Sequence, residues 1–179
     1  MKILVVCQHY WPEPYPLTDI CEALVQRGHI VDLVTDVPNY PMGETYSGYE
    51  KGKRREEIHN GVHIIRSFTI PRKHNAVFRL LNYYSYAWSS SLLVKKLPDD
   101  YDVVFTNQTS PVMMSSAAFA YAKKNHKKVV MYCMDLWPAC LAAGGVSESS
   151  PLYKFFGAVS KRLYLSLIHI SEPTRHAQI

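Results

Sequence analysis

Four short apolar runs recur along the chain at intervals that suit buried strands. They are Ile3–Val6, Ile30–Val34, Asp102–Phe105 and Val129–Cys133, and each holds at most one charged residue. A strand that is apolar on both faces belongs inside a parallel sheet, where helices cover both sides. A helical pattern separates the first two runs, and a crossover of this kind is right-handed and joins a parallel pair. The chain is therefore expected to alternate strands with helices.

Helical spacing is found in the segments between these runs. Apolar residues repeat at three to four positions from residue 20, with Thr18 or Asp19 as a cap and Gly28 as a stop. Pro111 suits the first position of a helix that continues to about residue 123, and a last helix is expected over 152–163.

The segment 76–96 is expected to form the longest helix. Its apolar positions recur every three to four residues, which predicts one face packed on the core. The alternative is that its aromatic residues rest on a membrane surface. The apolar stripe consists of Phe78, Leu81, Tyr84, Trp88, Leu92 and Leu93, and the aromatic set of Tyr83, Tyr84, Tyr86 and Trp88.

Two irregular features lie between residues 38 and 66. Residues 38–55 contain prolines, glycines and tyrosines without a period, which is typical of a long functional or disordered loop. Asn60–Gly61 then stands between two short strand-like runs, 57–59 and 62–66, and this dipeptide predicts a hairpin with a type I′ turn.

Together these patterns predict an α/β fold of the Rossmann-like, doubly wound kind, with a mostly parallel sheet and a β-hairpin insertion. Ligands of such sheets bind beyond the carboxyl ends of the strands. The loops that follow the strands are therefore expected to build the site. They are Cys7–Pro16, Val37–Pro41, Gln108–Pro111 and Asp135–Pro138.

A net charge of +5 and a pI near 9.0 make the chain mildly basic, which suits a partner with phosphate groups or an anionic membrane. No nucleic-acid-binding motif accompanies this charge, so nucleic acid is not expected as a partner. The opening residues are too few for a signal peptide, and no apolar run reaches the roughly 20 residues of a membrane span. The sequence predicts a cytoplasmic protein, with peripheral contact to the cytoplasmic face of the inner membrane as a further expectation.

The end of the chain resembles something other than a protein family. Residues 165–175 match the translation of a transposase sequencing adapter, and residues 176–179 would then be read-through of an index. We therefore expect an incomplete domain over 1–164 and a non-native tail over 165–179, which is left out of fold reasoning. The alternative is a natural C-terminal strand followed by a polar tail.

Several loops carry a resemblance to family 4 glycosyltransferases of the GT-B class. Lys2–Pro14 is similar to the opening of these enzymes, and the stretch LVQRGHIVDLVT at Leu24–Thr35 resembles their Leu-x-x-Arg-Gly-His-x-Val motif. Pro38–Pro41 and Cys133–Pro138 are similar in the same order and spacing, which points to the subgroup that builds O-antigen or colanic-acid type polysaccharide. The chain departs from the pattern at His9, Pro16 and Cys140, which puts the acceptor specificity in doubt rather than the fold.

In similar enzymes two Rossmann-like domains enclose the active site, and the N-terminal one binds mainly the acceptor. The resemblance implies a glycosyltransferase fragment whose parent moves a hexosamine-type sugar from a nucleoside-diphosphate donor to a lipid-diphosphate-linked saccharide in cell-surface polysaccharide synthesis. The nucleotide-sugar is a substrate held mainly by the second domain, so no cofactor is expected. Nothing in 1–164 resembles that second domain, and the fragment alone is expected to be inactive.

Candidate site residues come from the loops at the strand ends. Asp135 is the candidate catalytic carboxylate, because it can orient an acceptor hydroxyl, although it could equally cap the helix after Pro138. Amide and aromatic side chains suit hydrogen bonding to a sugar and stacking on its ring. The candidates for acceptor or cleft binding are His9, Tyr10, Trp11, Glu13, Asn39, Tyr40, Gln108 and Trp137.

Basic residues near the long loop are expected to contact a membrane or phosphate groups, with a plain solvated charge run as the alternative. They are Lys51, Lys53, Arg54, Arg55, Arg72 and Lys73. No metal site is expected, because His59 and His63 are separated by a turn and no C-x-x-C pair is present.

Two rival functions remain open at this point. One is a non-catalytic α/β module that only binds a ligand. The other is a nucleotide-sugar epimerase or dehydrogenase, but the loop from Cys7 to Leu17 holds no glycine and so lacks the G-x-G-x-x-G fingerprint of a dinucleotide site.

Overall fold

The computed structural model describes residues 1–165 and 167, so the expected tail over 165–179 lies outside it except at Leu165 and Leu167. Its centre is a six-stranded sheet in the order β3-β4-β2-β1-β5-β6, in which only β3 runs antiparallel to its neighbour. The α/β architecture with a mostly parallel sheet is therefore confirmed. The strands are β1 Lys2–Val6, β2 Ile30–Thr35, β3 Glu56–His59, β4 Val62–Arg66, β5 Val103–Gln108 and β6 Lys128–Cys133.

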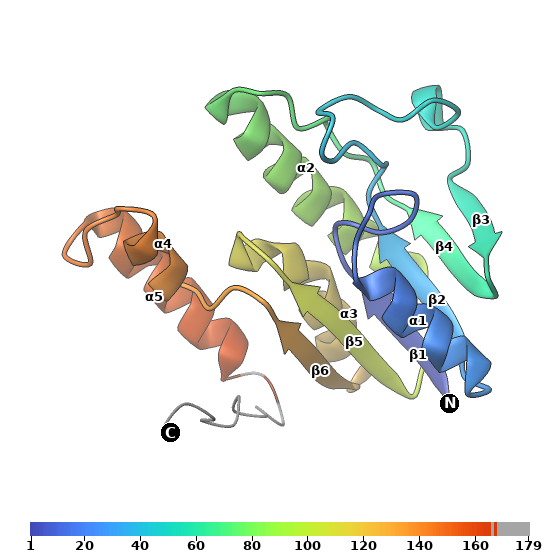
Figure 1. Ribbon diagram of the computed structural model, residues 1–179. Coiled ribbons are helices and arrows are strands. Elements are labelled where there is room, and N and C mark those ends of the chain that lie inside the picture. Colours follow the sequence, from blue (N-terminus) through green and yellow to red (C-terminus); the bar gives the residue numbers. More distant parts are fainter. Residues whose placement is uncertain (166, 168–179) are drawn as a thin grey trace, which may run out of the picture.

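Helices cover both faces of the sheet, as Figure 1 shows. Helix α1 lies on one face, α2 and α3 lie on the other, and α4 and α5 lie beyond the β6 edge. The helices are α1 Leu17–Gln26, α2 Ala76–Leu93, α3 Ser116–Asn125, α4 Ala139–Ala143 and α5 Pro151–Tyr164. Three short 3₁₀ segments are η1 Glu50–Gly52, η2 Val94–Lys96 and η3 Val112–Ser115.

Each face of the sheet carries its own apolar cluster, because successive side chains of a strand point to opposite sides. Ile3 and Val5 of β1 belong to the cluster under α1. Leu4 and Val6 belong to the cluster shared with α3 and the end of α2. This two-sided burial explains why the parallel strands read as continuous apolar runs.

Some predicted helix starts were wrong. Helix α1 begins at Leu17 with Pro16 as its N-cap residue and no side-chain cap, so Thr18 and Asp19 lie inside the first turn. Proline is tolerated there because the first N–H groups of a helix have no intrahelical partner. Pro111 likewise precedes η3 instead of opening α3. Helix α4 is the helix after Pro138, and its five residues are too few to show a period in the sequence.

The hairpin prediction is confirmed. Strands β3 and β4 pair antiparallel, and Asn60 and Gly61 have φ angles of 46° and 82°, both in the left-handed region that a type I′ turn requires. A Cβ atom at Gly61 would lie 2.6 Å from Cγ1 of Val25, so the turn also packs closely against α1.

The expectation that the apolar stripe of α2 packs on the core is wrong for most of the stripe, although Leu93 at its end does pack on the core. Trp88 is 67% exposed, and Leu81, Tyr84 and Leu92 are exposed as well. Asn82, Tyr86 and Ser90 are buried instead, and the side-chain amide of Asn82 donates to the carbonyl of Ile70 at 2.8 Å. The buried side of the helix is therefore held by hydrogen bonds as well as by packing. Within the described residues, no helix has the length and apolar character needed to cross a bilayer.

Candidate functional site

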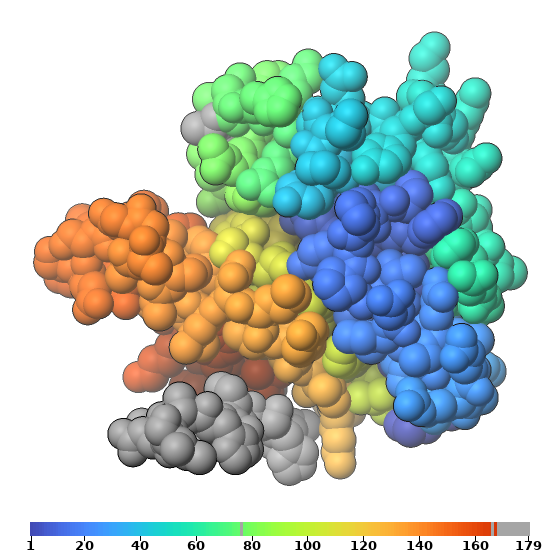
Figure 2. All heavy atoms as spheres, viewed as in Figure 1, coloured from blue at the N-terminus to red at the C-terminus, as the bar shows by residue number. Residues whose placement is uncertain are grey.

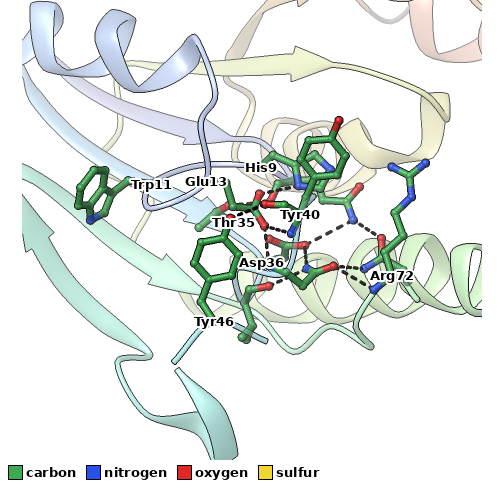
Figure 3. Close-up of polar contacts among 12 residues, drawn as sticks. His9, Trp11, Glu13, Thr35, Asp36, Tyr40, Tyr46 and Arg72 are labelled. Carbon is green, nitrogen blue, oxygen red and sulfur yellow. Dashed lines mark hydrogen bonds and ion pairs between the residues drawn. The ribbon is translucent and has the colours of Figure 1, made fainter. Parts of the chain in front are cut away.

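The loops that follow β1 and β2 meet in a buried polar network at the carboxyl edge of the sheet (Figure 3). Glu13 is its centre. One carboxylate oxygen, Oε1, accepts the backbone N–H groups of Asn39 and Tyr40 at 2.6 and 2.7 Å. The other, Oε2, lies 2.7 Å from Nδ1 of His9. Glu13 therefore ties the loop after β1 to the loop after β2, and its side chain is fully buried.

Asn39 extends the network toward α2. Its amide nitrogen donates to the Asp36 carboxylate at 3.1 Å and to the Val37 carbonyl at 2.8 Å. Its amide oxygen accepts the backbone N–H of Arg72 at 3.0 Å. The same oxygen lies 3.4 Å from the side-chain nitrogen of Asn82. Asn39 thus fixes the loop after β2 against both the segment before α2 and α2 itself.

Asp36 is a buried carboxyl in this network. Burial raises the pKa of Asp36 well above its usual range, and the negative charge of Glu13 raises it further. Hydrogen bonds from Asn39 and Gln8 and the charge of Arg66 act in the opposite direction but are weaker. Burial in the folded protein therefore favours the neutral form of Asp36 more than exposure to water does.

We expect Asp36→Asn to remove a pH dependence of stability. Because the folded pKa lies above the unfolded one, this group stabilises the fold fully below its unfolded pKa and loses that stabilisation as pH rises through the folded pKa. The slope is at most about 1.4 kcal/mol per pH unit. Urea midpoints of wild type and variant between about pH 4 and about pH 8 test this. The stability of the variant relative to the wild type should increase as pH rises. A difference that stays constant across that range contradicts the prediction.

Arg66, the last residue of β4, lies beneath the same two loops. Its side chain is 1% exposed, and its guanidinium donates to the backbone carbonyls of Asp36 and Trp11 at 3.1 and 2.7 Å. It also pairs with the carboxylate of Glu57 and lies over the ring of Tyr49, 4.8 Å from the centroid. The sequence analysis did not select Arg66 or Asp36. Arg66 ends β4 and Asp36 directly follows β2, and a position at the end of a strand was the signal that selected Asp135.

Two aromatic side chains of the predicted set reach the surface. Tyr40 is 38% exposed, its ring lies 5.1 Å from that of His9, and the guanidinium of Arg72 lies 5.8 Å from its centroid. Trp11 is equally exposed but stands apart from the network in Figure 3, stacked at 3.9 Å on the ring of His59. Tyr40 and Arg72 together therefore present a partly exposed aromatic ring with a cation over it.

The loops after β5 and β6 form a second polar group around Asp135. Its Oδ2 accepts from the backbone N–H and the hydroxyl of Ser110 at 2.9 and 2.7 Å. The indole N–H of Trp137 donates to the same hydroxyl at 3.1 Å. Asp135 makes no cap on α4, whose N-cap residue is Pro138 without a side-chain bond. The carboxylate is thus oriented by Ser110, and its catalytic role stays a prediction.

Tyr15 lies between the two polar groups. Its ring is 5.8 Å from that of His9, and its hydroxyl lies 3.7 Å from the sulfur of Met134, next to Asp135. Burial raises the pKa of Tyr15 to about 12, with a smaller contribution from nearby Cys7. The phenol therefore stays protonated at neutral pH and can act as a hydrogen-bond donor.

Other predicted cleft residues lie inside the protein. Tyr10 belongs to the apolar cluster under α1. Gln108 is fully buried and donates to the carbonyl of Asp135 and to the hydroxyl of Tyr164 at 2.8 and 2.9 Å. Trp137 is also buried, with its ring against Phe156. The contacts of these three residues hold the loops and helix α5 in place.

The predicted basic residues divide into two groups. Lys51, Lys53, Arg54 and Arg55 are exposed around η1, where Arg54 lies over the ring of Tyr49. Arg72 and Lys73 lie just before α2, and Arg72 also lies over the ring of Tyr83 at 5.4 Å. Within residues 1–165, Arg72 makes no ion pair with a carboxylate.

The structure brings three metal-ligand types together where the sequence predicted no metal site. Side-chain ligand atoms of His9, Glu13 and Asp36 lie within 4.8 Å of one another. Both oxygens of Glu13 already accept hydrogen bonds, and Oδ2 of Asp36 accepts one from Asn39. A bound cation would have to replace the His9–Glu13 hydrogen bond. The geometry thus favours a network that positions loops over a metal centre.

Comparisons with known proteins add little to this geometry. A scan of protein-family models and a search of curated proteins each found no match. Among solved structures, the chain is similar to the C-terminal domain of a hydrogenase from Pyrococcus furiosus, with a TM-score of 0.47 and 22% identity over 73% of this chain and 89% of that chain. A second crystal structure of that domain gives a TM-score of 0.44 and 19% identity over 73% and 90%. This likeness carries no argument about the site or its ligands.

Proposed function

We propose that the chain is the acceptor-side domain of a GT-B glycosyltransferase. It would hold a lipid-diphosphate-linked saccharide while a second domain supplies most of the site for a nucleoside-diphosphate sugar. Transfer forms a bond between an acceptor hydroxyl oxygen and the anomeric carbon of the donor sugar, and breaks the bond from that carbon to the diphosphate. The hydroxyl proton passes to a base, and the nucleoside diphosphate leaves.

The observation that carries the proposal is the placement of Tyr40 and Arg72. The ring of Tyr40 is partly exposed, so a sugar can pack against it, and the guanidinium of Arg72 over the ring can bind a phosphate oxygen. Glu13 fixes Tyr40 through its backbone N–H, and Asn39 fixes Arg72 through its backbone N–H. The saccharide and diphosphate of one acceptor would thus meet two side chains whose backbones are already positioned.

Asp135 fits this scheme as the residue that orients the acceptor hydroxyl. Ser110 holds Oδ2 of its carboxylate, so Oδ1 can accept a hydrogen bond from the hydroxyl. Tyr15 and His9 lie between Asp135 and Tyr40. These side chains would form the floor under the acceptor sugar.

Binding of a short-chain isoprenyl-diphosphate N-acetylhexosamine to the chain, measured by calorimetry without vesicles, tests the proposal. We expect Tyr40→Ala to weaken binding by about tenfold, which corresponds to about 1.4 kcal/mol of stacking. Tyr84→Ala is the matched control, because Tyr84 is also exposed but lies on the outer side of α2, and it should leave binding within about twofold.

Two outcomes would contradict the proposal. One is a wild-type chain that does not bind this compound, or binds it equally well without Tyr40. The other comes from the gene: the native reading frame should continue past codon 164 into a second Rossmann-like domain. A stop codon near residue 170 in clean sequence would favour the stand-alone binding module.

A further inference from the structure

His9 and Glu13 form a histidine–carboxylate pair in the loop after β1. The backbone N–H of Glu13 donates to the carbonyl of Tyr10 at 3.1 Å, and this turn brings Nδ1 of His9 to 2.7 Å from Oε2 of Glu13. The other oxygen of the carboxylate already accepts two backbone N–H groups. Because a carboxylate can only accept hydrogen bonds, Nδ1 of His9 is the donor in this pair.

The bond to Glu13 sets the tautomer of the neutral His9 ring. With the proton on Nδ1, the lone pair lies on Nε2, and that nitrogen is a base. Within residues 1–165, Nε2 makes no hydrogen bond, and it is not one of the fully buried polar atoms that lack a partner. The nitrogen therefore reaches solvent through the 8% of the side chain that is exposed, and a ligand can contact it.

The surroundings of His9 are those of the proposed acceptor site. Its ring lies 5.1 Å from that of Tyr40, and the guanidinium of Arg72 lies 5.8 Å from the same tyrosine ring, so that Figure 3 shows Tyr40 with His9 and Arg72 on either side. In Figure 2 the loop after β1, in dark blue, meets the segment around residue 40, in light blue, at the molecular surface. A sugar packed against Tyr40 therefore has hydroxyl groups within reach of the imidazole.

We propose that His9 is the base that takes the proton of the reacting acceptor hydroxyl. The hydroxyl oxygen keeps the electron pair of its O–H bond as it bonds to the anomeric carbon of the donor sugar, and the proton moves to Nε2. The bond from that carbon to the diphosphate breaks, and its electron pair leaves with the nucleoside diphosphate. The negative charge of Glu13 stabilises the imidazolium that forms, as in other histidine–carboxylate pairs. The proton returns to solvent after the products leave.

This inference rests on the proposed function and names the base which that function needs. Asp135 lies on the other side of Tyr15 from His9. A pyranose carries several hydroxyls, so one can donate to Oδ1 of Asp135 and thereby turn a neighbouring one toward Nε2 of His9. His9 is also a position at which this chain departs from the pattern of the family it resembles, so the pair is a feature of this chain.

Nitrogen NMR of the imidazole rings tests the tautomer of the full chain without a ligand. In the wild type at neutral pH, we expect His9 to carry its proton on Nδ1. In Glu13→Gln, the backbone N–H groups of Asn39 and Tyr40 take the amide oxygen, so the amide NH₂ group faces His9. The imidazole then has to accept at Nδ1, and its proton moves to Nε2. The urea midpoint checks that the variant is folded.

Reaction with diethyl pyrocarbonate, followed by mass spectrometry, tests whether Nε2 is an accessible base. The reagent acylates an unprotonated imidazole nitrogen, so wild-type His9 should be modified at neutral pH. Glu13→Gln should slow this modification by at least about tenfold, because the accessible nitrogen then carries the proton. His126, which is exposed at the end of α3, is the internal control and should react at the same rate in both proteins within about twofold.

The same reaction with ligand present tests the contact with the acceptor. At saturation, the short-chain isoprenyl-diphosphate N-acetylhexosamine should slow modification of His9 by at least about fivefold, because a hydroxyl then occupies Nε2. Isoprenyl diphosphate without the sugar can reach Arg72 but brings no hydroxyl to His9, and it should leave the rate within about twofold. His126 should be unaffected by either compound.

Three results would overturn the inference. The first is a wild-type His9 with its proton on Nε2. The second is a His9 that the reagent leaves unmodified while His126 reacts. The third is an acceptor that binds in the calorimeter but does not protect His9, and all three leave the proposed acceptor site standing. A chain that does not bind the acceptor at all contradicts the proposed function itself, and the assignment of His9 as its base is then wrong as well.

Discussion

Replacing Glu13 by alanine is expected to lower the free energy of unfolding by about 3–5 kcal/mol, because several buried groups lose their acceptor at about 1–3 kcal/mol each. The substitution leaves the backbone N–H groups of Asn39 and Tyr40 and the ring of His9 without their acceptor. Buried donors that lose a partner keep their desolvation cost, so the loss exceeds that of an ordinary hydrogen bond. Urea unfolding followed by circular dichroism measures it.

Two further variants separate the causes. Glu13→Gln keeps an oxygen for the two backbone N–H groups and removes only the charge. We therefore expect it to lower the free energy of unfolding by about 1–2 kcal/mol. Glu44→Ala changes an exposed glutamate in the same long loop and should stay within about 0.5 kcal/mol of the wild type. A Glu13→Ala protein as stable as the Glu44→Ala control would show that the carboxylate does not hold the two loops together.

Arg66→Met should be comparably destabilising, by about 3–5 kcal/mol. The methionine fills much of the same volume but leaves the Glu57 carboxylate without its cationic partner and the backbone carbonyls of Asp36 and Trp11 without the donors that Arg66 supplies. Because the Arg66 side chain is almost completely buried, water cannot replace these bonds without opening the site. Thermal or urea unfolding of the full chain measures the effect.

A double-mutant cycle isolates the ion pair. Glu57→Leu in the Arg66→Met background removes both charges, and the double variant should be more stable than the sum of the single effects by about 1–3 kcal/mol. Arg66→Lys keeps the charge but cannot make several bonds in one plane, so it should fall between wild type and Arg66→Met. Additive effects in the cycle would mean that Glu57 and Arg66 are not coupled.

The fold followed from the sequence wherever burial on both faces leaves an unambiguous pattern. The strands at Lys2–Val6 and Ile30–Thr35 and the turn at Asn60–Gly61 were predicted nearly as observed. Helix α2 shows the limit of such reasoning. Its period is correct, but a stripe of leucine and tryptophan looks the same whether it faces the core or the outside. Only the buried Asn82, Tyr86 and Ser90 decide which side faces in.

The sequence directed attention to the loops at the carboxyl ends of the strands, but it did not reveal the contacts that residues of these loops make. The loops at the strand ends contain Glu13, Asn39 and Asp135, as expected, yet the bonds of Glu13 and Asn39 link one loop to another. Partners from distant segments cannot be inferred from the local pattern. Arg66 illustrates this, because its guanidinium contacts backbone carbonyls 30 and 55 positions earlier in the chain.

The bonds made by Glu13 have a mechanical consequence. Two loops that belong to different strands share one anchor, so a fluctuation that lifts the Asn39–Tyr40 segment also removes both donors of Oε1 of Glu13, the residue that contacts His9. Motions of the two loops are therefore coupled through Glu13. A ligand that binds at the ring of Tyr40 would therefore change the mobility of the His9 imidazole even without contacting it.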